Sequence, residues 1–149
     1  IQRRLAGIGI KVEIRILEWT VFLTEFINKK KFEAVLLGWG LGLEPDNFDI
    51  WHSSKTREGE FNFINYKNDE VDRLLEEARR ICDQQERKSR YQRIHEIIYD
   101  EQPYMFLCVP DSLSVVHSRF RNVSPKPIGI RYNLINWSVP KAEQRYRIE

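Results

Sequence analysis

Hydrophobic and charged residues alternate along residues 10–16, where Ile and Val occupy every second position. This alternation predicts a β-strand that continues to about Trp19 and has one solvated face. From Trp19 to Phe26, large apolar residues recur every three or four positions, which predicts an amphipathic helix. The apolar run at residues 34–37 does not alternate, and such a run is typical of a strand covered on both faces. Strand, helix and buried strand together predict a βαβ unit and an α/β fold.

Two further helices are predicted in close succession after a polar stretch. Asn68 is placed to cap the first, whose apolar positions, from Val71 to Cys82, repeat at the spacing of one helix face. Asp83 and Glu86 form a variant of the capping box at the start of the second helix, which should end before proline 103. We therefore expect a helical hairpin with facing apolar stripes.

The chain changes character after this hairpin. Residues 104–110 form an apolar run that predicts a buried strand, and residues 111–120 predict a second strand or an irregular return. The last thirty residues mix proline, glycine and short β-prone pieces. We expect this segment to lie on a sheet edge or to cross to another part of the protein.

Composition and charge narrow the class of protein. The 149 residues are 42% hydrophobic, enough for one folded domain, and the net charge of +2 comes from scattered charges of both signs. Neither nucleic acid nor an anionic membrane is indicated as a partner. The apolar run at residues 34–43 is too short to cross a bilayer. Because the sequence starts at Ile1 within a helical pattern and lacks a leader, we interpret it as a fragment.

Cysteine and histidine give little indication of chemistry. Cys82 and Cys108 lack the spacing of metal ligands, and both are expected to be buried free thiols rather than a bridge. The sequence at His95 begins like a zinc-protease helix, but Tyr99 stands where the second histidine is needed. A nucleophile elbow is also missing. We expect no metal, no cofactor and no enzymatic activity.

The stretch "GWGLGLEPDNF" at residues 38–48 leaves the carboxyl end of the predicted buried strand. Ligands of open α/β sheets bind in that position, although an ordinary connecting loop with Trp39 as a core anchor would give the same pattern. Glu44, Asp46 and Asp49 bring acids into this loop. We favour a structural role for Asp46 and its neighbour because Asx side chains after a proline commonly cap a turn or helix.

Several stretches resemble the C-terminal part of the extracytoplasmic solute-binding proteins of the peptide/nickel ABC-transporter family. They are "FEAVLLGWG", "EPDNF", "WHSS", the hairpin sequence that starts at "FNFINYKNDEVDRLL", and "RFRNV". This resemblance implies the C-terminal lobe of a two-lobed (type II) periplasmic binding protein fold. It also implies a non-enzymatic protein that captures a peptide or another small polar solute and delivers it to ABC permease subunits. The expected location is periplasmic or extracytoplasmic, with or without a lipid anchor.

The resemblance also implies an organisation and a site. Residues 1–118 would form the ligand-binding lobe, and residues 119–149 would return to complete the N-terminal lobe. The residues expected to contact the ligand are Trp39, Gly40, Leu41, Gly42 and Glu44, and those expected to shape the loop are Pro45, Asp46 and Asn47.

One position departs from the family pattern. Peptide-binding relatives often carry an Asp three residues after this Trp to hold the α-amino group of the ligand, whereas this chain has Gly42 there and Glu44 as its first acid. Glu44 could substitute for the missing Asp, or the ligand could lack a free amine. Since one lobe supplies only half of a cleft, we expect weak or no binding by this chain alone.

The alternative is a stand-alone interaction or sensor module that reuses the same lobe. Oligomeric state separates the two hypotheses, because a lobe without its partner should expose apolar surface and self-associate.

Overall fold

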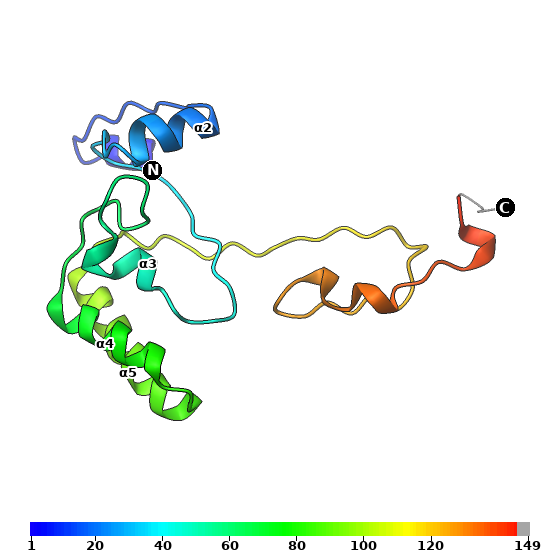
Figure 1. Cartoon of the computed structure of the whole chain (residues 1–149). Coiled ribbons are helices and arrows are strands. Elements are labelled where there is room, and N and C mark those ends of the chain that lie inside the picture. Colours follow the sequence, from blue (N-terminus) through cyan, green and yellow to red (C-terminus); the bar gives the residue numbers. More distant parts are fainter. Residues whose placement is uncertain (146–149) are drawn as a thin grey trace. The chain divides into compact units, whose positions relative to one another are not determined.

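The computed structural model describes residues 1–145, and the chain divides into two compact units. The first unit comprises Ile1–Trp39 and Asp46–Tyr104, and the second comprises Gly40–Pro45 and the chain from Met105 onward. The helices of the first unit are α1 (Gln2–Ala6), α2 (Trp19–Val21), η1 (Phe22–Ile27), α3 (Phe48–Trp51), η2 (Ser53–Lys55), α4 (Asp69–Arg80) and α5 (Gln84–Glu101) (Figure 1). Those of the second are η3 (Ile130–Asn136) and η4 (Lys141–Glu143).

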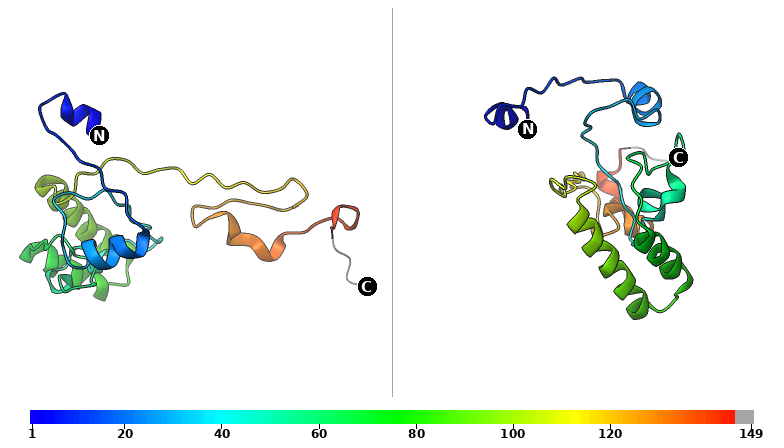
Figure 2. Two further views of the ribbon diagram at one scale, coloured as in Figure 1. Left: turned by 90° about the horizontal axis from the view of Figure 1, so that it is seen from above. Right: turned by 90° about the vertical axis from the view of Figure 1, so that its left-hand side faces the viewer.

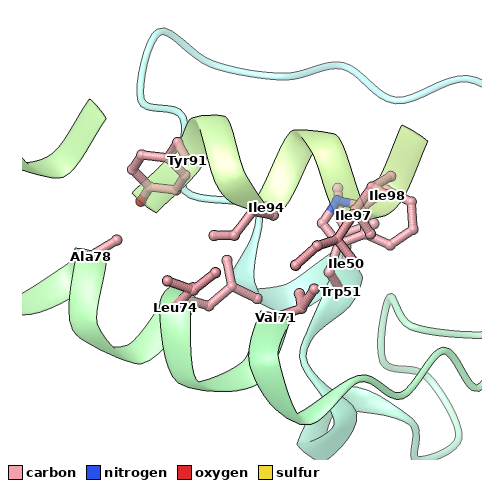
Figure 3. Close-up of a cluster of buried hydrophobic side chains, with 10 residues drawn as sticks. Ile50, Trp51, Val71, Leu74, Ala78, Tyr91, Ile94, Ile97 and Ile98 are labelled. Carbon is pink, nitrogen blue, oxygen red and sulfur yellow. The ribbon is translucent and has the colours of Figure 1, made fainter. Parts of the chain in front are cut away.

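The predicted helical hairpin is confirmed and forms the centre of the first unit. α4 and α5 lie side by side (Figures 1 and 2). Their facing side chains interdigitate, and two residues of α3 close one end of the cluster (Figure 3). Burial of each large aliphatic side chain contributes about 1.5–3 kcal/mol to folding. The buried cluster consists of Ile50, Trp51, Val71, Leu74, Leu75, Ala78, Tyr91, Ile94, Ile97 and Ile98.

The predicted N-cap residues of the two hairpin helices, Asn68 and Asp83, are also confirmed. The Asn68 side chain accepts hydrogen bonds from the backbone N–H groups of Glu70 (2.9 Å) and Val71 (3.1 Å). The Asp83 carboxylate accepts one from the N–H of Glu86 at 2.7 Å. These contacts satisfy N–H groups that lack partners inside a helix. α5 ends at Glu101, directly before Gln102, which adopts a left-handed conformation with φ of 46°.

The prediction that both cysteines are buried is wrong. α4 ends at Arg80, and the next residue, Ile81, is extended with φ of −99° and ψ of 119°. The helical spacing therefore does not reach Cys82, which is exposed. Cys108 is also exposed, in an extended segment of the second unit, and both thiols are free, as expected.

The predicted helix after Trp19 is confirmed, in two parts. Glu18 caps α2 by accepting a hydrogen bond from the N–H of Val21 at 3.0 Å. The helix then widens into η1, a π-helix whose bonds span five residues, as in Asn28 N–H to the Leu23 carbonyl at 2.9 Å. Ile27 is the buried residue of this helix.

The predicted strands and the βαβ unit are not confirmed. Residues 10–16, 34–37 and 105–110 have no helix or strand assigned, and residues 1–145 contain only isolated bridges, Arg121 with Ser138 and Lys126 with Gly129. Residues 105–117 run as an extended trace, yellow in Figures 1 and 2. Side chains expected to be buried are exposed, such as Ile16 at 93% and Val109 at 95%. A strand is held by hydrogen bonds to a neighbouring strand, and these segments have no such neighbour among the described residues.

No helix in the described part of the chain is long and apolar enough to cross a membrane.

Candidate functional site

Trp39, which follows the predicted buried strand at residues 34–37, belongs to an aromatic cluster of the first unit. Its indole meets the ring of Phe61 edge to face, with centroids 5.5 Å apart and planes at 67°. It also stacks on Phe63 at 6.0 Å and 27°. Phe63 is buried, whereas Trp39 keeps 36% of its surface exposed. The indole is therefore fixed by two rings and still presents a flat surface to solvent.

The cluster continues from Phe63 into the core of the hairpin. The ring of Tyr104 lies 6.3 Å from that of Phe63 and 4.8 Å from that of Trp51. Burial raises the pKa of the Tyr104 phenol, with a smaller opposing effect from the Trp39 side chain. Trp39 is thus connected through ring contacts to Trp51, a member of the buried cluster.

A fully buried amide, Asn62, holds the loop that carries both phenylalanines. Its side-chain NH₂ donates to the carbonyls of His52 (3.1 Å) and Tyr66 (2.9 Å), and its side-chain oxygen accepts from the N–H of Tyr66 at 2.9 Å. Lys30 supports the same loop from the end of η1 by donating to the carbonyl of Thr56 at 2.6 Å and to the side chain of Asn65. The loop is therefore fixed at several points.

The other expected contact residues belong to the second unit. Leu41 and Glu44 are exposed. A Cβ atom built on Gly40 would meet no atom within 4 Å, and one on Gly42 would meet only the Glu44 nitrogen, at 4.0 Å. Both glycines lie outside the left-handed region. Neither backbone strain nor crowding by described residues therefore accounts for glycine here.

Residues 45–47, which were expected to shape the loop, lead into α3. One oxygen of Asp46 accepts from the N–H of Phe48 at 3.1 Å, and the other accepts from Arg79 Nε at 2.7 Å. The Arg79 guanidinium lies 4.0 Å from the centroid of the Phe48 ring. The Asn47 carbonyl accepts from the N–H groups of Ile50 and Trp51, both at 3.1 Å, and Pro45 precedes this turn. Asp46 thus ties the start of α3 to α4.

Sequence reasoning missed His52 and the loop around Asn62. His52 is buried, stacks on Phe48 at 4.1 Å, shares a 2.7 Å hydrogen bond with Ser54, and has Glu76 3.4 Å from its Nε2. Neither residue belongs to a periodic apolar pattern, although both lie in stretches that carry the family resemblance, "WHSS" and "FNFINYKNDEVDRLL". The signal available was "FNF", a polar residue between two aromatic ones.

The described residues contain no group of three or more His, Cys, Asp and Glu side chains that could hold a metal ion. The first unit instead offers a preformed aromatic surface made by Trp39 and Phe61, and in the sequence Trp39 is directly followed by the glycine-rich segment. Such surfaces bind apolar parts of ligands, and open backbone can donate and accept hydrogen bonds.

Known proteins resemble the chain in sequence. No protein-family model matches it. The oligopeptide-binding protein AppA of Bacillus subtilis is 34% identical over 95% of the chain, and the probable di/tripeptide-binding protein 5 of Pseudomonas aeruginosa is 24% identical over 87%. These matches cover 26% and 25% of the two relatives, so the chain spans about a quarter of their length.

Solved structures agree with the sequence matches. The structure of AppA from Bacillus subtilis in complex with a nonapeptide matches 94% of the chain and 28% of its own, at a TM-score of 0.78 and 34% identity. The ABC transporter-associated periplasmic binding protein DppA from Helicobacter pylori, in complex with the peptide STSA, matches 69% of the chain and 21% of its own, at a TM-score of 0.63 and 34% identity. Over most of its length the chain is thus similar to about a quarter of an oligopeptide- or dipeptide-binding protein.

Proposed function

We propose that the protein is the substrate-binding component of an ABC importer and captures a peptide between two lobes before delivery to membrane permease subunits. The observation that carries the proposal is the 34% identity to AppA over 95% of the chain, together with the TM-score of 0.78 to the nonapeptide complex. The relatives are binding proteins, which supports a role without catalysis. They favour this role over a stand-alone sensor module.

The whole protein would act outside the cytoplasm, with or without a lipid anchor. Residues 1–118 would belong to the ligand-binding lobe, and residues 119–149 would return to the N-terminal lobe. Closure of the two lobes would bury the ligand, and the affinity would come from desolvated apolar contacts and backbone hydrogen bonds.

In this proposal the ligand is contacted by Trp39, Gly40, Leu41 and Gly42. Trp39 supplies a flat apolar surface, and the open space at Gly40 lets the backbone approach the ligand. Asp46 and Asn47 shape the turn after this segment. The hydrogen bonds of Asp46 to Phe48 and Arg79 support that role.

Calorimetry with the protein expressed from its complete reading frame tests the proposal. Peptides of three to nine residues should bind saturably, at micromolar concentration or below. A folded protein that binds none of them would overturn the proposal. Residues 1–149 alone should bind weakly or not at all, because they supply one wall of the cleft.

Glu44 is the acid proposed to hold the α-amino group of a peptide. Glu44→Gln should weaken binding of a free peptide about ten- to a hundredfold, since a hydrogen bond to a charged group contributes about 1.5–3 kcal/mol. Titration calorimetry with the free and the N-acetylated peptide measures this effect. Glu58→Gln, at another exposed glutamate, is the control. Equal losses for both peptides would show that Glu44 does not recognise the amine.

A further inference from the structure

Phe61 is an exposed aromatic residue held against the candidate ligand-binding tryptophan. The residue is 54% exposed, yet its ring contacts the Trp39 indole edge to face with centroids 5.5 Å apart. The Trp39 indole also stacks on Phe63, which is buried. Phe61 therefore adds little to the core, and its ring and the indole together expose apolar surface to solvent.

The loop fixes the direction in which Phe61 points. The chain turns just before it, where the Arg57 N–H donates to the Glu60 carboxylate at 2.9 Å and the Glu60 N–H donates to the Arg57 carbonyl at 3.1 Å. Directly after it, Asn62 is fully buried, and its N–H donates to the Lys55 carbonyl at 3.0 Å. Because Glu60 and Asn62 on either side are held by these hydrogen bonds, the Phe61 ring is already in its exposed position and no rearrangement of the loop is needed to place it there.

We infer that Phe61 is a further ligand-contacting residue, which forms with Trp39 a preorganised aromatic surface for a bulky apolar or aromatic side chain of a bound peptide. The inference rests on the proposed function. Two rings at 67° present an edge and a face, the arrangement in which a third aromatic ring finds favourable contacts with both. A fixed surface also binds with a smaller loss of conformational freedom than a mobile one.

Phe61→Ala in the protein expressed from its complete reading frame tests the inference. The probes are tetra-alanine and the four tetrapeptides that carry one Phe on the alanine background. Tyr99→Ala is the matched control, because Tyr99 is an aromatic residue on α5 with 73% of its surface exposed. Circular dichroism establishes that both variants are folded, and calorimetry measures each affinity.

The expected result is selective. Phe61→Ala should weaken binding of the tetrapeptides whose Phe reaches this surface by about two- to tenfold, the range expected for one aromatic contact. Tetra-alanine should bind the variant as it binds the wild type, and Tyr99→Ala should change none of the affinities.

Other results would contradict either the role of Phe61 or the proposed function itself. Equal weakening of all five peptides, or no weakening of any, would overturn the role of Phe61 while leaving peptide capture intact. If wild-type protein binds no peptide of any length, the proposed function fails, and the inference fails with it.

Discussion

At the scale of single residues, the first unit depends on a few buried or half-buried polar side chains. The Asn62 side chain bonds backbone groups four to eleven residues away, and the Asp46 side chain joins the start of α3 to Arg79 on α4. Polar groups removed from water are costly unless they are paired. Each of these two side chains therefore stabilises the fold through particular hydrogen bonds, and replacing either should lower the free energy of unfolding.

Asn62→Ala should lower the free energy of unfolding by about 1–3 kcal/mol. The reason is that the variant leaves the N–H of Tyr66 and the carbonyls of His52 and Tyr66 without the bonds that Asn62 now makes. Urea unfolding followed by circular dichroism measures the change. Asn136→Ala, at an exposed asparagine of the second unit, should have little effect. Equal stability of the two variants would show that the buried amide does not hold the loop.

The same two residues show what sequence reasoning can identify at this scale. Asp46 follows a proline and precedes a helix, a local pattern with a known physical meaning, and its side chain does bond the N–H two residues ahead. Asn62 acts on partners between four and eleven residues away, and no local pattern specifies them. Only the folded loop brings these partners to the Asn62 amide.

At the scale of elements, the α4–α5 hairpin is closed by a polar cluster at one end. The Glu101 carboxylate, on the last residue of α5, accepts a hydrogen bond from the Tyr66 hydroxyl and another from the Asn68 side chain at 2.8 Å. Asn68 also caps α4. One carboxylate therefore joins the end of one helix to the start of the other.

Tyr66 should make the stability of this hairpin fall as the pH rises through the alkaline range. Burial, and then the neighbouring Glu101 carboxylate, raise the pKa of its phenol above the ordinary value of 10.0. The folded state therefore prefers the protonated phenol. The protonated phenol contributes fully to the free energy of unfolding below about pH 10, the pH near which the phenol titrates in the unfolded chain. This contribution is lost as the pH rises from there towards the pKa of the phenol in the folded state.

Tyr66→Phe removes this titration. Between pH 8 and pH 11, the free energy of unfolding should fall more steeply for wild-type protein than for the variant, as urea titrations at each pH would measure. Tyr99→Phe, at an exposed tyrosine, should retain the wild-type slope. Parallel pH profiles for wild type and Tyr66→Phe would contradict the proposed coupling.

The elements that could be predicted are those whose stabilising contacts are local or paired in sequence. α4 and α5 follow each other directly, so an apolar stripe on each and a cap at each start define both the helices and their partner. The alternation at residues 10–16 indicates a wet and a dry face but carries no information about what covers the dry one. Side chains such as Ile14 and Ile16 are accordingly exposed in the structure.

At the scale of the whole molecule, exposed apolar side chains concentrate in the extended segments. In the second unit, Val109, Leu113 and Val115 are each more than nine-tenths exposed along one continuous stretch. Extended backbone with free hydrogen-bonding groups and apolar side chains pairs readily with another chain. The hairpin, by contrast, keeps its apolar residues in a shared core.

We therefore expect residues 1–149 to self-associate in a concentration-dependent way, through the stretch that contains Val109 and Val115. Sedimentation velocity over a hundredfold range of concentration, about 1–100 μM, would detect the larger species. Val109→Lys with Val115→Lys should shift the population towards monomer, because charged side chains on an unpaired strand oppose edge pairing. Tyr99→Lys, on α5, should not. A chain that stays monomeric throughout, or a double variant that associates as strongly as wild type, would show that this stretch does not mediate association.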